Sequence, residues 1–146
     1  MYSNLSGSSD LKSPITVLLV DDDEIARFLW KRAIESSEAG MLVKESSNGL
    51  EALNFLKNHW NEPLALPDII FLDINMPVMN GLAFLDEYAK LSKTSDIHIP
   101  IYILSSSIMP EEMAKINNSP AVSGFIPKPF KMEKFEKIMQ TFNETT

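Results

Sequence analysis

Residues 15–23 read Ile-Thr-Val-Leu-Leu-Val-Asp-Asp-Asp, and residues 68–73 read Asp-Ile-Ile-Phe-Leu-Asp. Each stretch contains an apolar run with almost no polar alternation, which is typical of a strand covered on both faces. Each run ends in aspartate. In an open parallel sheet, ligands bind outside the carboxyl ends of the strands. These two stretches therefore predict both the kind of fold and the place of a functional site.

The chain around these two stretches alternates between short apolar runs and longer segments with helical periodicity. Three more strands are expected, at Met41–Val43, Ile99–Leu104 and Ala121–Ile126. Helices are expected after Asn48, Asn80 and Pro110, and a loop between Asn58 and Pro67 because of its two prolines. Two further helices are indicated by apolar stripes, at Ile25, Phe28, Leu29 and Ile34 and at Phe135, Ile138, Met139 and Phe142. Five strands alternating with five helices predict an α/β fold with helices on both faces of a parallel sheet.

The composition excludes several classes of protein. The 146 residues are 45% apolar and 23% charged, as in a single globular domain. A net charge of −7 disfavours binding to nucleic acid or to an anionic membrane, and the longest apolar run is too short to span a bilayer. The absence of cysteine and of a signal peptide predicts a cytoplasmic location. We expect a flexible leader at residues 1–13, a folded domain at 14–143 and no output domain.

Polar side chains follow four of the predicted strands, and their types indicate a reactive site at one edge of the sheet. They are Asp21–Asp23, Asp73, Ser105–Ser107 and Lys128, which stands between two prolines. Converging carboxylates repel one another, so a cation must lie among them. An all-oxygen set of ligands favours Mg²⁺ over zinc or copper. A carboxylate flanked by Mg²⁺, an ammonium group and a hydroxyl is well arranged to accept a phosphoryl group.

Four segments together resemble the receiver domain of two-component response regulators, in particular the stand-alone regulators of chemotaxis. They are Leu19–Glu24, Phe71–Pro77 with Asn80 and Gly81, Leu104–Ser106, and Phe125–Phe130. The resemblance implies a flavodoxin-like, doubly wound, five-stranded parallel sheet of order 2-1-3-4-5 with five helices.

The resemblance also implies the residues of a phosphorylation site that uses Mg²⁺ as cofactor. Asp73 would be the phosphoacceptor and would contribute to the metal site. Asp22 would bind Mg²⁺ directly, and Asp21 would act nearby, mostly through water. The main-chain carbonyl of Asn75 would be the third protein ligand. Asn75 and Ser107 lie where the family tunes the lifetime of the phosphoryl group.

A second group of residues would respond to phosphorylation. Ser105 would be the switch hydroxyl that bonds the phosphoryl group, and Lys128 would pair with the phosphoryl oxygens. The Lys128–Pro129 peptide bond would be cis, which costs little before proline. Phe125 would be the aromatic switch, at a place where the family often has tyrosine.

The implied function is phosphorelay signalling by a protein that is not an enzyme, since any hydrolysis of its phospho-aspartate would be self-catalysed. A sensor histidine kinase or a histidine phosphotransfer protein would be the phosphoryl donor. Phosphorylation would change the face formed by the fourth helix, fifth strand and fifth helix. That face would bind an unidentified protein target, or the chain would pass the phosphoryl group onward.

Other interpretations of these residues stay open from sequence alone. An aspartate-nucleophile phosphatase of the haloacid dehalogenase type needs a second aspartate where this chain has Asn75. An interaction scaffold that works without phosphorylation is a further alternative. Asp21–Asp23 could merely cap a helix, with Asp23 the best candidate for that role. Ser105–Ser107 could be a plain polar loop, and Phe125 could belong to the core.

Overall fold

The computed structural model of the chain describes residues 14–37, 40–129 and 131–145. The strands are β1 (Thr16–Val20), β2 (Leu42–Ser46), β3 (Ile69–Asp73), β4 (Ile101–Ser105) and β5 (Val122–Pro127). The helices are α1 (Glu24–Glu35), α2 (Gly49–His59), α3 (Gly81–Ser92), α4 (Pro110–Asn117) and α5 (Met132–Thr145), with a short 3-10 helix, η2 (Pro63–Ala65). The leader predicted for residues 1–13 lies outside the described residues.

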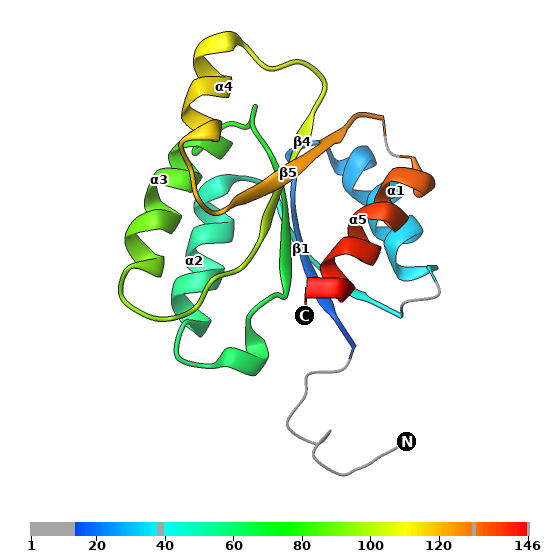
Figure 1. Cartoon of the computed structure of the whole chain (residues 1–146), viewed down its shortest axis with the longest axis horizontal. Helices are drawn as coiled ribbons and strands as arrows, with labels where there is room; N and C mark the ends of the chain where they lie inside the picture. The colour runs from blue at the N-terminus through cyan, green and yellow to red at the C-terminus, as the bar shows by residue number, and fades with distance from the viewer. Residues whose placement is uncertain (1–13, 38–39, 130, 146) are drawn as a thin grey trace.

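All five strands run parallel in one sheet, in the order β2-β1-β3-β4-β5. Figure 1 shows α2, α3 and α4 on one face of the sheet and α1 and α5 on the other. Every residue of β1 and β3 is buried, because helices cover both faces of these central strands. The predicted flavodoxin-like, doubly wound sheet of order 2-1-3-4-5 with five helices is confirmed.

Polar caps start three of the helices directly after strand ends or loops. The Asp23 carboxylate accepts hydrogen bonds from the main-chain amides of Ile25 and Ala26, at 3.0 and 3.1 Å. Asn48 and Asn80 cap α2 and α3 in the same way. Since Asp23 satisfies the first amides of α1, Asp21 and Asp22 are left free of this capping role.

Two apolar cores lie on the two faces of the sheet. The core beneath α1 and α5 centres on Phe71, whose ring meets those of Trp30, Tyr102 and Phe135 edge to face, with centroids 5.8, 6.2 and 6.0 Å apart. The core beneath α2, α3 and α4 contains Trp60. None of the described helices is both long and apolar enough to cross a membrane.

The apolar stripe predicted for α1 is only partly buried. Ile34 lies in the core, whereas Ile25, Phe28 and Leu29 are 72%, 58% and 56% exposed. The helix instead packs through Trp30 and Ile34, which are four residues apart. The stripe correctly indicates the helix, but helical spacing shows which side chains share a face and not which face is covered.

The bounds of β2 and of the loop after α2 differ in kind from the sequence prediction, and β4 and β5 are shifted by one or two residues. The strand expected at Met41–Val43 runs over Leu42–Ser46, where Lys44 and Glu45 are exposed. These polar residues belong to an edge strand and therefore interrupt the apolar run from which strands were predicted. The loop expected between Asn58 and Pro67 contains the end of α2 and the helix η2.

The loop between β3 and α3 is held tightly beside the end of β3. Val78 adopts a φ of +68°, a left-handed conformation that costs a β-branched residue about 1–3 kcal/mol. The Gly81 amide donates a hydrogen bond to the Ile74 carbonyl at 2.9 Å. A Cβ atom on Gly81 would lie 2.5 Å from the Asp73 carbonyl oxygen, so only glycine allows this approach.

Candidate functional site

Side chains from four strand ends meet at the carboxyl edge of the sheet. Asp21 and Asp22 follow β1, and Asp73 is the last residue of β3. Ser105 ends β4, and Lys128 follows β5. The parallel register of the sheet places these ends side by side. The sequence therefore identified the rim at which the polar groups converge.

Asp21, Asp22 and Asp73 form an acidic cluster in which one carboxylate oxygen of each lies within 4.8 Å of the others. Asp21 is fully buried and Asp73 is 8% exposed, whereas Asp22 faces solvent. Two buried carboxylates with an exposed third can hold a hard divalent cation that keeps part of its water shell. The donor set of the cluster therefore suits Mg²⁺.

Lys128 forms ion pairs with both buried carboxylates. Its Nζ atom lies 3.1 Å from Asp21 Oδ2 and 3.4 Å from Asp73 Oδ2. The Lys128 main-chain amide donates to the Ser105 carbonyl at 2.7 Å, and the Lys128–Pro129 peptide bond is cis. The ammonium group thus compensates much of the negative charge that the fold buries here.

The compensation is incomplete at Asp73. Burial raises the pKa of the Asp73 carboxyl, and the neighbouring Asp21 carboxylate raises it further. Lys128 and the Asn75 amide lower that pKa without offsetting the burial. Burial alone would lower the pKa of Lys128, but the charges of Asp21 and Asp73 outweigh it and leave that pKa raised. Metal-free Asp73 is therefore an electrostatically strained carboxylate, which a bound cation would stabilise.

We expect the stability of the metal-free protein to fall as the pH rises through the pKa of Asp73. The folded chain keeps the Asp73 proton at pH values, above about 3.8, where the unfolded chain has lost it. The contribution is thus fully present below the unfolded pKa and is lost above the folded one. In urea unfolding with EDTA, the free energy of unfolding of Asp73→Asn should increase relative to that of the wild type as the pH rises. A difference independent of pH would contradict the raised pKa.

The other predicted residues surround this cluster less closely. The Asn75 amide lies 3.4 Å from Asp73 Oδ1, and the Asn75 side chain is exposed. Ser105 is half-buried and Ser107 is exposed. Phe125 is 37% exposed on β5, between the core and the solvent. The structure gives their positions, and their roles stay predictions.

Sequence reasoning missed Arg27, which lies on α1 and contacts the acidic segment. Its Nη1 atom donates to the Asp21 carbonyl oxygen at 2.7 Å, and its Nε atom donates to Glu45 Oε1 at 3.2 Å. No pattern in the sequence points to Arg27, because its two partners lie in segments far apart in the sequence and one of them is a main-chain atom.

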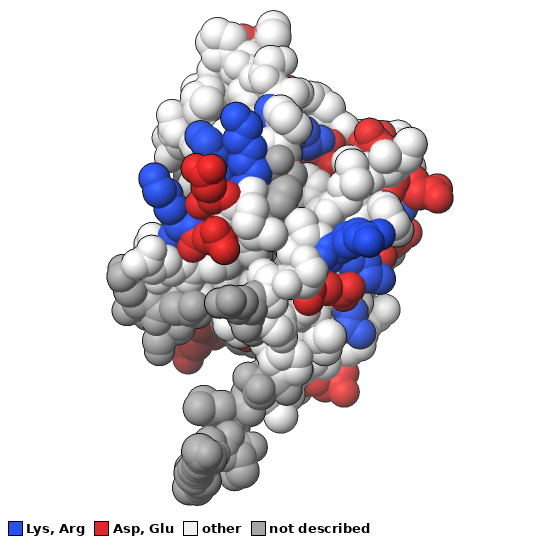
Figure 2. All heavy atoms as spheres, turned by 90° about the vertical axis from the view of Figure 1, so that its right-hand side faces the viewer, with Lys and Arg blue, Asp and Glu red and all other residues white. Residues whose placement is uncertain are grey.

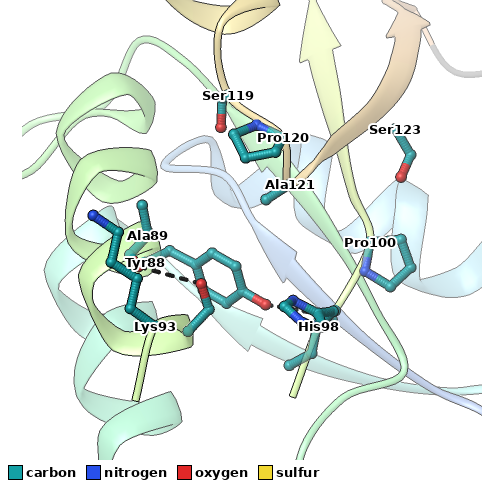
Figure 3. Close-up of a pocket in the computed structure, with 11 residues that line it drawn as sticks. Tyr88, Ala89, Lys93, His98, Pro100, Ser119, Pro120, Ala121 and Ser123 are labelled. Carbon is teal, nitrogen blue, oxygen red and sulfur yellow. Dashed lines mark hydrogen bonds between the residues drawn. The ribbon is translucent and has the colours of Figure 1, made fainter. Parts of the chain in front are cut away.

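A cleft elsewhere on the molecule takes no part in this cluster. It has a volume of about 480 Å³ and lies between the end of α3 and the starts of β4 and β5 (Figure 3). The Tyr88 hydroxyl accepts a hydrogen bond from the Ile99 amide at 2.8 Å in its wall. Lys93 and His98 also line it, and none of the predicted site residues does.

The comparisons with known proteins agree with this geometry. The sequence profile of the response regulator receiver domain matches residues 17–140. The chain is 29% identical over 131 residues to the polar-differentiation response regulator DivK of Brucella anthropi, over 88% of this chain and 96% of DivK. It is 35% identical over 122 residues to a protein-glutamate methylesterase/protein-glutamine glutaminase of Treponema pallidum, over 82% of this chain and 27% of that protein.

The chain spans 12% to 53% of the length of the first five curated relatives that it matches. Among solved structures, a chain of the CheX–CheY–BeF3–Mg²⁺ complex from Borrelia burgdorferi has 25% identity and a TM-score of 0.71. That likeness covers 88% of this chain and 90% of the other. The motifs, the sheet order and the profile match thus lead to one conclusion: the chain belongs to the response regulator receiver domain family.

Proposed function

We propose that this chain accepts a phosphoryl group on Asp73 from a phosphohistidine of a sensor kinase or histidine phosphotransfer protein. The acidic cluster would bind the Mg²⁺ ion that the reaction needs. The observation that carries the proposal is the convergence of three carboxylates within 4.8 Å, with the Lys128 ammonium 3.4 Å from Asp73. The structural relative from Borrelia burgdorferi, in complex with Mg²⁺ and BeF3, supports the same chemistry.

Several residues of the chain would have separate roles in phosphoryl transfer. An Asp73 carboxylate oxygen attacks phosphorus while the bond from phosphorus to the donor's histidine nitrogen breaks, and the imidazole leaves. Asp22 and the Asn75 carbonyl would hold Mg²⁺ directly, and Asp21 through water. Lys128 would pair with a phosphoryl oxygen. Bound Mg²⁺ would neutralise charge on the transferring oxygens.

The response to phosphorylation would start at the hydroxyl of Ser105. We infer that this hydroxyl bonds the phosphoryl group and draws the loop after β4 inward. Phe125, which is 37% exposed on β5, would then rotate into the space left behind. The face of α4, β5 and α5 would change in shape, either to bind a target protein or before the phosphoryl group is passed onward.

A protein donor needs a surface beside the acidic cluster, and α1 offers one. Ile25, Phe28 and Leu29 form an exposed apolar patch on the helix that begins directly after Asp23. Large apolar side chains grouped on one helix face favour a protein contact. Figure 2, which shows the side of the molecule that carries α1 and α5, has basic and acidic side chains close together there. We place the donor's docking surface on this patch.

The two alternative functions have weaker support. An aspartate-nucleophile phosphatase would need a proton donor two residues after Asp73, where the exposed amide of Asn75 stands. A phosphorylation-independent scaffold would not need the buried carboxylates of Asp21 and Asp73, which are costly to hold in the fold. Turnover of a small phosphoester would favour the phosphatase.

A cytoplasmic location stays a prediction from the absence of cysteine.

Intact-protein mass spectrometry after incubation with acetyl phosphate tests the proposal. We expect the wild type to gain one phosphoryl mass when Mg²⁺ is present and none when EDTA removes the metal. A gain that does not depend on Mg²⁺ would contradict the metal assignment. If no gain occurs, titration with Mg²⁺ and beryllofluoride separates a donor-restricted receiver, which binds them, from a scaffold, which does not.

A further inference from the structure

The guanidinium of Arg27 joins two segments that the sequence keeps apart. It donates to the Asp21 carbonyl oxygen at 2.7 Å and to Glu45 Oε1 on β2 at 3.2 Å. The Arg27 side chain is 16% exposed and the Glu45 side chain 34%, so the contact with the Asp21 carbonyl is partly buried and the contact with Glu45 is exposed. Glu45 also pairs with Lys31 of α1 at 3.3 Å, which fixes the carboxylate that receives Arg27. The planar guanidinium suits such a double contact, since its donors have fixed directions.

The segment that Arg27 contacts carries two of the three acids of the cluster. The Asp21 amide donates to the Ser46 carbonyl at 3.2 Å, and the Asp23 amide donates to Asp21 Oδ1 at 2.9 Å. The Asp21 carbonyl is therefore held by Arg27, while its amide and side chain are held by other partners. Asp22 follows in the chain with an exposed side chain, so its direction depends on how the Asp21 main chain is fixed.

The charge of Arg27 works against a cation at this site. The Arg27 guanidinium is hydrogen-bonded to the main chain beside the acidic cluster and repels a nearby divalent ion. Its Coulomb effect alone therefore weakens Mg²⁺ binding. Glu45 partly offsets that repulsion through the ion pair. An arginine placed here thus weakens cation binding by its charge and can favour it only through geometry. Charge and geometry therefore predict opposite effects for its removal.

We propose that Arg27, anchored by Glu45, is a positioning residue that orients the Asp21–Asp22 main chain so that the Asp22 carboxylate faces the metal ion. This inference rests on the proposed Mg²⁺ site. Replacement of a residue that contacts and orients a metal ligand, without touching the metal, typically changes metal affinity by 10-fold or more. Since Arg27 contacts a neighbouring carbonyl rather than a ligand oxygen, we expect an effect at the low end of that range.

Isothermal titration of the metal-free protein with MgCl₂ tests the proposal, with no phosphoryl donor present. We expect Arg27→Gln to weaken Mg²⁺ binding by roughly 10-fold. Arg27→Lys keeps the charge but cannot make both contacts, so it should also bind Mg²⁺ more weakly than the wild type. The matched control is Arg32→Gln, which removes the same charge from an exposed position on the same helix and should leave the affinity unchanged or slightly tighter.

The outcomes separate this inference from the proposed function. Equal or tighter binding by Arg27→Gln would show that geometry does not outweigh charge at this residue and would overturn the positioning role. Wild-type affinity in Arg27→Lys would do the same, and this variant decides the question if Arg27→Gln does not fold. Circular dichroism establishes folding for each variant. Failure of the wild type to bind Mg²⁺ would overturn the proposed site itself.

Discussion

Asp73→Asn is expected to abolish phosphorylation by acetyl phosphate and Mg²⁺, reducing the mass gain to background. An amide has no anionic oxygen that can attack phosphorus, so no other change in the site is needed for complete loss. Removal of the buried carboxylate also relieves the repulsion between Asp73 and Asp21, so the variant should fold at neutral pH. Circular dichroism and intact mass measured on the same sample show whether the loss is chemical.

Asp23→Asn is the matched control for that experiment. It makes the same chemical change two residues after Asp21, at an aspartate that caps α1 through the amides of Ile25 and Ala26. Asparagine caps helices about as well as aspartate, so this variant should gain the phosphoryl group as the wild type does. A mass gain that persists in Asp73→Asn would mean that another residue accepts the phosphoryl group, and it would contradict the proposed function.

Lys128→Met is expected to lower the free energy of unfolding by about 3–5 kcal/mol at neutral pH without metal. The Lys128 ammonium pairs with Asp21 and Asp73, at 3.1 and 3.4 Å, and methionine fills the same space without a charge. Two buried carboxylates then face each other without a cation. Urea unfolding in EDTA measures the loss, and Lys90→Met, at an exposed lysine, should leave the free energy of unfolding nearly unchanged.

Addition of Mg²⁺ should recover most of the stability that Lys128→Met loses. A ligand that binds only the folded state stabilises it according to its affinity. The variant offers the ion more uncompensated negative charge than the wild type, so Mg²⁺ should stabilise the variant more. A loss below about 1 kcal/mol in EDTA would mean that the carboxylates of Asp21 and Asp73 do not depend on Lys128 for compensation.

The parts of the fold that sequence predicted are those with one dominant physical cause. Strands β1 and β3 are covered on both faces, so burial forces an unbroken apolar run that can be recognised without a structure. Asp21, Asp22, Asp73 and Lys128 could be grouped because each follows such a run, and parallel strands bring their carboxyl ends together. The resemblance to receiver domains then supplied roles for these residues.

The parts that sequence missed depend on tertiary contacts. The exposed positions of β2 carry Lys44 and Glu45, because an edge strand can face solvent. The stripe of Phe28 and Leu29 shows that two side chains share a helix face, and only packing decides that this face stays open. Arg27 contacts the Asp21 carbonyl in the loop after β1 and the Glu45 carboxylate on β2, and only the folded structure brings these two groups together.

Each of the two apolar cores contains one tryptophan. Trp30 belongs to the core beneath α1 and α5, beside Phe71, two residues before Asp73 on β3. Trp60 belongs to the core on the opposite face, with Tyr88 edge to face at 6.2 Å. Under excitation selective for tryptophan, a chain in which Trp60 is replaced by phenylalanine would emit only from the α1–α5 side, and one that lacks Trp30 only from the other. The fold thus carries its own pair of fluorophores, one for each side of the sheet.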